Sequence, residues 1–362
     1  MTILQDCNKN TAISGLPLAD LENLLQTGDN HLPKYRAKQI FDWVQRGVDS
    51  FDEMTNLSID LRKQLSKQFT LRKTQILKSI KDKDGTKKLQ IELNDGNIIE
   101  SVILVDGADR KTACLSTQVG CPMACAFCKT GSLGFLRNLD SCEINEQLLH
   151  IQKDASASKI SNIVFMGMGE PLLNIAELEK TLMIICSGMS KRRITISTCG
   201  IIDGIYKLAD KGLGIRLAVS LTTADESLRT QLMPVTKKNP LGELKKALTY
   251  YQQRENQRIT LECVLLGGIN TRSQDITTLV DFAAGLDVII NLIPWNPIEN
   301  MLFKGTLLKE PSAAEVKNFE LALTQSGLKT ALRYKKGRNV CGACGQLGVV
   351  NFSKHLLTAQ DN

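Results

Sequence analysis

Three cysteines within eight residues constrain this chain more than any other feature. Cys121, Cys125 and Cys128 have the spacing C-x3-C-x2-C. A loop with this spacing can turn three thiolates toward one centre, and thiolates are soft ligands that suit zinc and iron–sulfur clusters. A structural zinc needs four ligands in a closed tetrahedron, whereas a cluster held by three cysteines leaves one iron open to a substrate. The sequence therefore predicts a metal centre of one of these two kinds.

The composition indicates one large domain and a small one. The chain has 362 residues, of which 43% are hydrophobic, and its eleven cysteines are too dilute for a disulfide framework. Residues 1–10 are polar, and no stretch approaches the ~20 apolar residues of a membrane span. We therefore expect a cytoplasmic protein with no membrane segment, in which clustered cysteines bind metal or carry out redox chemistry.

The positive charge is unevenly placed. The net charge is +7, but the segment from Arg62 to Lys88 has ten Lys or Arg residues against only Asp82 and Asp84, a formal +8. Such a patch is typical of proteins that contact nucleic-acid phosphates. The alternative is an ordinary solvated helix face.

The first 105 residues are expected to form an accessory domain. Residues 1–14 resemble a disordered lead-in, and residues 16–69 contain three amphipathic helical patterns rich in Lys and Arg. Between residues 70 and 105 the pattern becomes alternating, with a hairpin turn at 94–97, and this predicts a small antiparallel sheet. The domain is either an RNA-docking module or merely a helical cap.

Residues 106–347 are expected to form the core of an α/β fold, with 348–362 as a tail. Six apolar strands, separated by helical patterns, are predicted at 113–118, 162–166, 193–197, 214–220, 258–265 and 288–293. Repeated strand–helix units imply a parallel sheet with right-handed crossovers, in which functional loops lie at the carboxyl ends of the strands. The candidate motifs fall at those ends, which favours a partial (β/α)6 barrel around a cluster.

Polar residues follow several of these strands. Gly169 and Glu170 lie in a Gly-Met-Gly-Glu-Pro run, where glycine allows close approach of a ligand and Glu170 offers a carboxylate. The alternative is a turn in which proline starts a helix. Ser197, Ser220 and Asn296 end three later strands and could hydrogen-bond a ribose or a carboxylate, although such residues are also common turn formers.

Three further cysteines need a role. Cys114 precedes Cys121 by seven residues, and Cys341 and Cys344 form a C-x2-C pair, which suggests zinc or redox chemistry. Joined to the first loop, this pair could complete a four-cysteine zinc site.

These motifs together resemble a known family. The cysteine loop, with Phe127 before its last cysteine, and the Gly-Glu-Pro run resemble those of the radical S-adenosylmethionine (SAM) enzymes. With Cys-Leu-Ser-Thr-Gln-Val-Gly-Cys at 114–121, Pro-Trp-Asn-Pro at 294–297 and Ala-Cys-Gly-Gln-Leu at 343–347, the chain resembles the RlmN family of dual-specificity RNA adenine-C2 methyltransferases from about residue 16 to 347.

The resemblance implies cofactors and partners. A [4Fe-4S] cluster would be held by Cys121, Cys125 and Cys128. SAM would be bound by Gly169, Glu170, Ser197, Ser220, Leu221, Thr222 and Asn296. The expected partners are 23S rRNA, tRNA and an electron donor such as flavodoxin, and the chain is expected to be a monomer.

The resemblance also implies a two-step reaction, because adenine C2 is electron-poor and cannot attack a sulfonium methyl. Cys344 would take a methyl group from one SAM, and a 5′-deoxyadenosyl radical from a second SAM would activate that group for addition to C2. Cys114 would release the RNA by forming a disulfide with Cys344, and Glu100 would remove the C2 proton.

The sequence departs from the family pattern at two points. Thr222 stands where the family has His, and Cys341 is an unexpected neighbour that could compete for the disulfide. Five further cysteines are expected to be packing residues: Cys7, Cys142, Cys186, Cys199 and Cys263. The alternative functions are a C8-specific (Cfr-type) methyltransferase and a zinc-stabilised RNA-binding protein.

Overall fold

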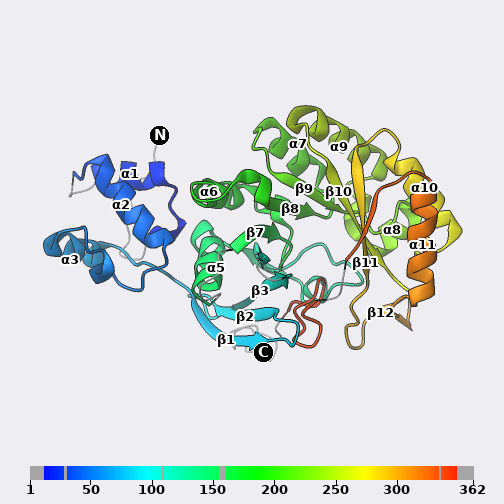
Figure 1. Cartoon of the computed structure of the whole chain (residues 1–362), viewed down its shortest axis with the longest axis horizontal. Helices are drawn as coiled ribbons and strands as arrows, with labels where there is room; N and C mark the ends of the chain where they lie inside the picture. Colours follow the sequence, from blue (N-terminus) through cyan, green and yellow to red (C-terminus); the bar gives the residue numbers. More distant parts are fainter. Residues whose placement is uncertain (1–11, 28–30, 108–109, 155–159, 334–335, 349–362) are drawn as a thin grey trace, which may run out of the picture.

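A ten-stranded mixed sheet forms the frame of the molecule (Figure 1). The computed structural model describes residues 12–27, 31–107, 110–154, 160–333 and 336–348, so the predictions for 1–11, Cys7 and 349–362 lie outside it. The strand order is β1-β2-β3-β4-β7-β8-β9-β10-β11-β14. The strands are β1 (Gln75–Lys81), β2 (Lys87–Glu92), β3 (Ile98–Asp106), β4 (Arg110–Cys114), β7 (Ile160–Phe165), β8 (Ile194–Thr198), β9 (Arg216–Ser220), β10 (Ile259–Leu265), β11 (Val288–Pro294) and β14 (Thr330–Leu332).

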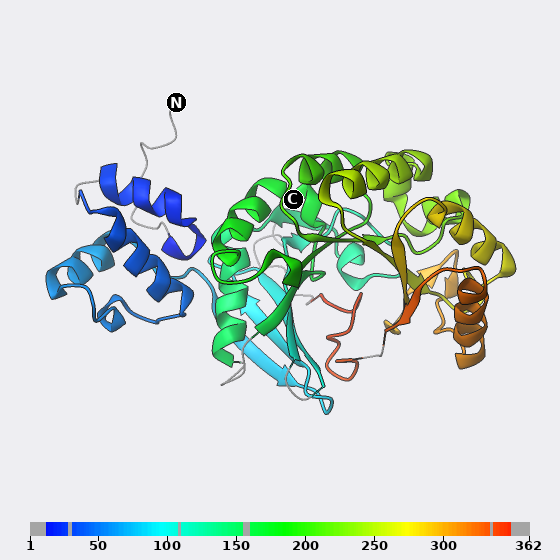
Figure 2. The same ribbon diagram turned by 45° about the horizontal axis from the view of Figure 1, so that its top comes forward.

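The parallel half of this sheet confirms the predicted partial barrel. The strands from β4 to β14 pair in parallel, each with its neighbour. The helices on their outer side are α5 (Ser141–Asp154), α6 (Ile175–Ile185), α7 (Ile202–Asp210), α9 (Leu241–Glu255), α10 (Ser273–Ala283) and α11 (Ala313–Gln325). The short helix α8 (Glu226–Leu232) follows β9 and contacts the cysteine loop, where the Leu232 carbonyl accepts from the Ala126 N–H (2.9 Å). The turned view shows the C-terminal segment 336–348 on the concave side of the curved sheet (Figure 2).

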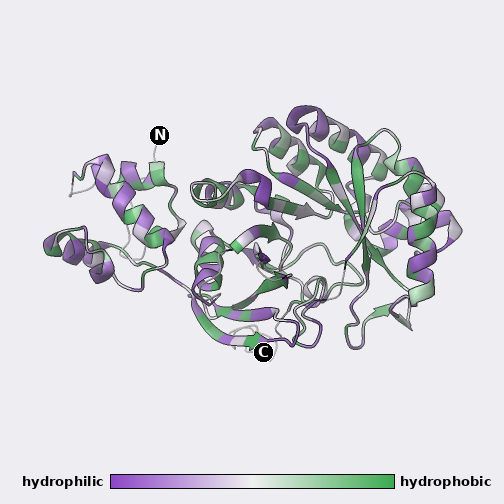
Figure 3. Ribbon diagram, in the orientation of Figure 1, coloured by the Kyte–Doolittle hydropathy of each residue, from purple (hydrophilic) through white to green (hydrophobic). Residues whose placement is uncertain are grey.

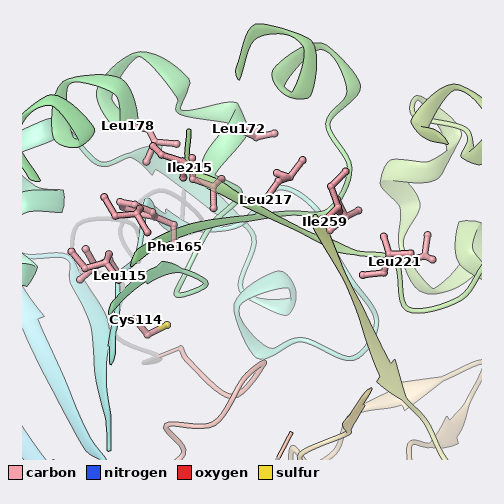
Figure 4. Close-up of a cluster of buried hydrophobic side chains, with 14 of the residues drawn as sticks. Cys114, Leu115, Phe165, Leu172, Leu178, Ile215, Leu217, Leu221 and Ile259 are labelled. Carbon is pink, nitrogen blue, oxygen red and sulfur yellow. The ribbon is translucent and has the colours of Figure 1, made fainter. Parts of the chain in front are cut away.

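The core of the barrel lies between the sheet and its helices. The strands are mostly hydrophobic, whereas the outer faces of the helices are hydrophilic (Figure 3). Phe165, Leu217 and Ile259 are at most 1% exposed, and burying one such side chain contributes about 1.5–3 kcal/mol. Cys114 lies at the edge of this apolar cluster (Figure 4). The apolar layer therefore fixes the strand on which Cys114 is placed.

Three helices form a separate unit beside the barrel. They are α1 (Leu18–Thr27), α2 (Lys34–Gln45) and α3 (Ile59–Gln68), and the first residue of α3 follows Ser58, whose side chain accepts a hydrogen bond from the Leu61 N–H. The unit has its own apolar core, which Ile184 of α6 joins from the barrel side. The predicted disordered lead-in is wrong at its end, because residues 13–15 form a buried 3-10 helix.

The expected domain boundary at residues 105 and 106 does not separate two sheets. It falls inside β3, which pairs with β2 on one side and with β4 on the other. The antiparallel strands β1–β3 therefore extend the barrel sheet instead of forming a small sheet of their own. Alternation in the sequence predicts a strand, but it does not show which neighbour the strand pairs with.

The basic segment is only partly available to a ligand. Lys88 is buried and forms an ion pair with Glu100, Lys87 pairs with Asp154, and Arg72 pairs with Asp49. Five lysines of the segment remain exposed: Lys63, Lys67, Lys78, Lys81 and Lys83. In the described ranges, no helix is long and apolar enough to cross a membrane.

A buried polar cluster anchors the helical unit to the barrel. Glu146 of α5 accepts hydrogen bonds from Ser14 Oγ (2.6 Å), from the Thr74 N–H (2.8 Å) and from Thr74 Oγ1 (2.6 Å). His150 Nε2 lies 2.9 Å from Thr74 Oγ1. Because the single hydroxyl proton of Thr74 goes to Glu146, that oxygen accepts the Nε2–H proton of a neutral His150. Burial, with a contribution from Arg72, lowers the pKa of His150 to about 4.

We predict that this histidine makes the fold sensitive to acid. An unfolded histidine has a pKa near 6.5, so between about pH 6.5 and 4 the unfolded state binds more protons. The free energy of unfolding therefore falls by up to about 3 kcal/mol as the pH drops through this window. Urea unfolding across pH should show a shallower fall for His150→Gln than for the matched exposed-histidine variant His31→Gln. An equal slope in the two variants would contradict the assignment.

Candidate active site

The cysteine loop is shaped by its own backbone. It runs from β5 (Gln118–Gly120) to the short helix α4 (Lys129–Ser132). Gly120 has φ +76°, and a Cβ there would lie 2.0 Å from the Gly134 carbonyl oxygen, so the position requires glycine. The Cys121 N–H donates to that oxygen (2.7 Å), and the Cys128 N–H donates to the Cys125 carbonyl (3.2 Å). The backbone hydrogen bonds and the glycine at 120 therefore define the path of the loop.

Cys121, Cys125 and Cys128 line one cavity of about 130 Å³. Burial raises the pKa of Cys121 and raises that of Cys128 to about 12. A thiolate is the form that binds metal. Charge from a bound cation would therefore have to offset the cost of forming a thiolate in this buried cavity. Within the described residues, no three His, Cys, Asp or Glu side chains already converge in metal-binding geometry. The donor set, three soft thiols at one cavity, nevertheless fits an iron–sulfur cluster.

The Gly-Glu-Pro run forms the wall beside these thiols. Gly169 has φ +100°, and a Cβ there would lie 2.5 Å from Cβ of Gln118. Glu170 is 1% exposed and lines the cavity. Its carboxylate accepts from the backbone N–H of Cys199 (2.7 Å) and of Leu172 (3.1 Å), while burial raises its pKa. These contacts fix a carboxylate at the cavity wall, where it can accept further hydrogen bonds.

The other predicted SAM ligands divide into two groups. Ser197, Ser220 and Asn296 line the same cavity as the cysteines. The buried Oδ1 of Asn296 has no hydrogen-bond partner in the described part of the chain, which leaves an acceptor for a bound ligand. Leu221 and Thr222 are buried and do not line this cavity; both donate their N–H to the Glu262 carbonyl (3.0 Å each).

Thr222 is strained. Its φ is +64°, which is an outlier for a β-branched residue, and its buried hydroxyl has no hydrogen-bond partner within the described residues.

The C-terminal loop is held against the cysteine loop. The Lys129 N–H donates to the Gly345 carbonyl (2.8 Å), and Thr130 Oγ1 donates to the Leu347 carbonyl (2.6 Å). Asn296 Nδ2 also donates to the Cys344 carbonyl (3.3 Å). The first two bonds connect positions more than 200 residues apart in the chain, and the three together bring Cys344 to the cavity of the cysteine loop.

Cys344 and Cys114 share a second cavity, of about 470 Å³. Cys344 is partly solvent-accessible inside it, yet the surrounding protein raises the pKa of its thiol. Burial raises the pKa of Cys114 to about 12, and a negative charge on Cys344 would raise it further. Cys341 is exposed and lines neither cavity. The structure thus brings together the two cysteines for which sequence reasoning predicted a disulfide.

Glu100 lies outside both cavities. Its carboxylate is 1% exposed, pairs with Lys88 Nζ (2.9 Å) and accepts from the Gly348 N–H (2.7 Å). The contact with Gly348 places it next to the C-terminal loop that carries Cys344. The positive charge of Lys88 balances the charge of the Glu100 carboxylate, which lines neither of the two cavities.

Sequence reasoning missed three residues of the site. Glu262 is 5% exposed, lines the cysteine-loop cavity and accepts from Asn291 Nδ2 (2.6 Å). Arg333 lines both cavities. Cys199, predicted to be a packing residue, also lines the cysteine-loop cavity, and its thiol contacts that of Cys125. A charged residue in the middle of an apolar strand, as at Glu262, was the one available signal.

Comparisons with known proteins identify the family. A radical SAM superfamily model matches residues 115–282, and a model of the ribosomal RNA large subunit methyltransferase N-terminal domain matches residues 12–71. A protein of Treponema denticola named as a probable dual-specificity RNA methyltransferase RlmN is 52% identical over 93% of this chain and 95% of its own. The chain belongs to the RlmN family. A Thermotoga maritima protein of the same name is 44% identical over 87% of this chain and 92% of its own.

A solved structure supports the fold of this RlmN-family chain. A radical SAM methyltransferase from Sphaerobacter thermophilus covers 93% of this chain and 99% of its own, with a TM-score of 0.87 and 34% identity. Radical SAM enzymes use a [4Fe-4S] cluster and SAM, so the family membership decides between the cluster and the zinc alternative. The cofactors predicted from the sequence are confirmed.

We predict that, of the cysteines, only Cys121, Cys125 and Cys128 are required for the protein to bind iron. Protein purified without oxygen should be brown and contain about four iron atoms per chain. Cys121→Ala, Cys125→Ala and Cys128→Ala should each lose most of this iron, because each removes a thiolate from a three-cysteine site. Cys341→Ala, an exposed cysteine, is the matched control and should retain it. Zinc in place of iron, or iron loss in the control, would contradict the ligand set.

Proposed function

We propose that the chain methylates C2 of an adenosine in the peptidyl transferase centre of 23S rRNA, and the adenosine 3′ of the anticodon in some tRNAs. The observation that carries the proposal is the attachment of the Cys344 loop to the cysteine loop, with Cys114 across a shared cavity. A radical SAM barrel without a methyl carrier would not need this second cysteine pair.

Cys344 is proposed to carry the methyl group. Its sulfur attacks the methyl carbon of one SAM molecule, the bond between that methyl and the sulfonium breaks, and S-adenosylhomocysteine leaves while S-methylcysteine forms. The raised pKa of the Cys344 thiol means that its proton must leave as the new bond forms. The residues of the smaller cavity would hold the cluster and a second SAM, which, once an electron donor had reduced the cluster, would supply a 5′-deoxyadenosyl radical. Cys344 would present its S-methyl group to lose a hydrogen atom to that radical. The partial solvent access of Cys344 within the cavity allows an RNA base to reach the methyl carbon.

Cys114 is proposed to release the product. After the methyl carbon has bonded to C2, the sulfur of Cys344 still joins the RNA to the protein. Cys114 attacks that sulfur, a disulfide forms and the carbon–sulfur bond breaks. Its pKa of about 12 keeps this thiol protonated until then, which protects it from earlier reaction. Cellular reductants would then restore both thiols, as expected in the cytoplasm.

Glu100 is proposed as the base that removes the C2 proton. Its carboxylate already contacts the Cys344 loop through Gly348, but Lys88 must release it before it can accept a proton. The remaining SAM contacts are proposed for Gly169, Glu170, Ser197, Ser220 and Asn296, which surround one cavity. Leu221 and Thr222 would contribute through the backbone turn at 221–222.

The N-terminal helical unit, residues 12–71, is proposed to dock RNA. Its exposed Lys63 and Lys67 can contact phosphates, so binding should weaken with salt. An electron donor such as flavodoxin, a monomeric state and a cytoplasmic location complete the proposal.

The first test is product analysis. Unmodified rRNA and tRNA are incubated without oxygen with SAM and a strong reductant, and the nucleosides are compared by mass spectrometry with C2- and C8-methyladenosine. We expect C2-methyladenosine from the wild type and none from Cys344→Ala. Cys114→Ala should retain RNA covalently on Cys344, and Cys341→Ser is the control that should still turn over. A C8 product would correct the regiochemistry, and an unmodified RNA would overturn the substrate.

The base assignment has a separate test. Glu100→Gln should lower the rate of RNA methylation by about 10²-fold or more, because general-base catalysis contributes that much, while leaving S-methylation of Cys344 unchanged. Lys88→Gln is the companion variant: it breaks the same ion pair but keeps the carboxylate. If Glu100→Gln and Lys88→Gln each lower the rate of RNA methylation and the rate of Cys344 S-methylation to the same extent, Glu100 has only a structural role.

A further inference from the structure

Five cations surround the amino-terminal ends of three neighbouring barrel strands. Lys191, Arg192 and Arg193 form the exposed turn before β8, Arg216 is the first residue of β9, and Arg258 precedes β10. We call these residues the mouth cations. They lie at the opposite end of the strands from the cysteine loop, and none belongs to the basic segment between Arg62 and Lys88.

Three of the mouth cations form no ion pair with a described residue, although the Glu255 carboxylate lines the same groove. Lys191, Arg192 and Arg216 form no hydrogen bond or ion pair with any residue in the described ranges. Among the described residues, Arg193 donates to the Ser161 carbonyl (3.1 Å), and Arg258 pairs with the carboxylate of Asp287 (2.8 Å). Exposed guanidinium and ammonium groups without a carboxylate partner can bind anions such as phosphates.

These cations line a route into the barrel. Lys191, Arg192, Arg216 and Arg258 line an open groove of about 990 Å³ at the strand ends. Arg216 also lines the 470 Å³ cavity that contains Cys114 and Cys344, so the groove and the cavity meet at this side chain.

The inner wall of the cavity is polar as well as basic. Asn162, Thr195 and Asn291 project from three strands, and Arg193 and Arg333 lie at the two ends of the wall. The cavity volume is in the range of small-molecule sites, which accommodates one nucleoside turned out of an RNA strand.

We propose that the amino-terminal mouth of the barrel is a second RNA-binding surface, where the mouth cations hold phosphates next to the target nucleotide and the base enters the barrel toward Cys344. The proposal rests on the proposed RNA substrate, but it adds a surface separate from the N-terminal helices. Amide groups along the cavity offer both donors and acceptors, as the edge of an adenine requires, and the cations match the phosphates on either side.

Equilibrium RNA binding tests the surface without requiring turnover. A labelled, unmodified RNA hairpin containing the target adenosine is titrated with the wild type, Lys191→Glu/Arg192→Glu and Arg216→Glu at several salt concentrations. We expect Kd to rise about 10-fold or more for the mouth variants, with a shallower salt dependence because phosphate contacts are lost. SAM cleavage by Lys191→Glu/Arg192→Glu in the absence of RNA should be unchanged.

The matched control reverses the same amount of charge elsewhere. Lys207 of α7 and Lys317 of α11 are exposed on outer helices and form no ion pair in the described part of the chain. Lys207→Glu/Lys317→Glu should therefore change Kd by less than about twofold. If the mouth variants bind RNA as tightly as this control, the mouth is not an RNA surface.

Photocrosslinking tests the position of the RNA. Hairpins carrying 4-thiouridine directly beside the target adenosine should crosslink to peptides that contain residues 189–193 or 214–217. Crosslinks confined to residues 12–71 would overturn the proposal. Since neither experiment needs methylation, a wild-type enzyme that binds at the mouth but forms no C2-methyladenosine would contradict the proposed function and still support this surface.

Discussion

The attachment of the C-terminal loop to the cysteine loop is the contact on which the rest of the site depends. Hydrogen bonds from Lys129 and Thr130 to the carbonyls of Gly345 and Leu347 place the carrier cysteine candidate beside the cluster ligands. Each bond contributes only about 0.5–1.5 kcal/mol, so the loop can shift when RNA or SAM binds. The bonds are formed by backbone groups and one threonine hydroxyl, so they do not depend on the unexpected Cys341 that precedes Cys344 in this chain.

Two cavities meet at Cys344, and their walls differ in chemistry. The smaller cavity has thiols, two buried carboxylates and strand-end serines, which suits a cluster with SAM. The larger has amides and guanidinium groups, which suits a nucleotide. A methyl carrier between a cofactor space and a substrate space must reach both, and Cys344 is one of the few side chains that lines both. Under the proposed function, this division would let one partial barrel serve two successive methyl-transfer steps.

Much of the fold could be predicted from the sequence, because apolar strands separated by helical patterns leave few other arrangements. The cysteine spacing and the Gly-Glu-Pro run indicated residues that the structure places around one cavity. The pairing of β3 with β4 could not be predicted, since alternation does not specify a partner. The role of α5 was missed because its buried face is polar, with Glu146 and His150 bonded to a linker far away in the sequence. Glu262 and Arg333 were missed because a single charge inside a strand, as at Glu262, or directly after one, as at Arg333, matches no motif.

The most direct test of the account is the location of the methyl group on the protein. The wild type is incubated with CD₃-labelled SAM in the absence of RNA, and its peptides are analysed by tandem mass spectrometry. The account predicts one CD₃ group on the sulfur of Cys344, with Cys114 and Cys341 unlabelled. A label on Cys341, or on no cysteine in a protein that still methylates RNA, would contradict the proposal that Cys344 carries the methyl group.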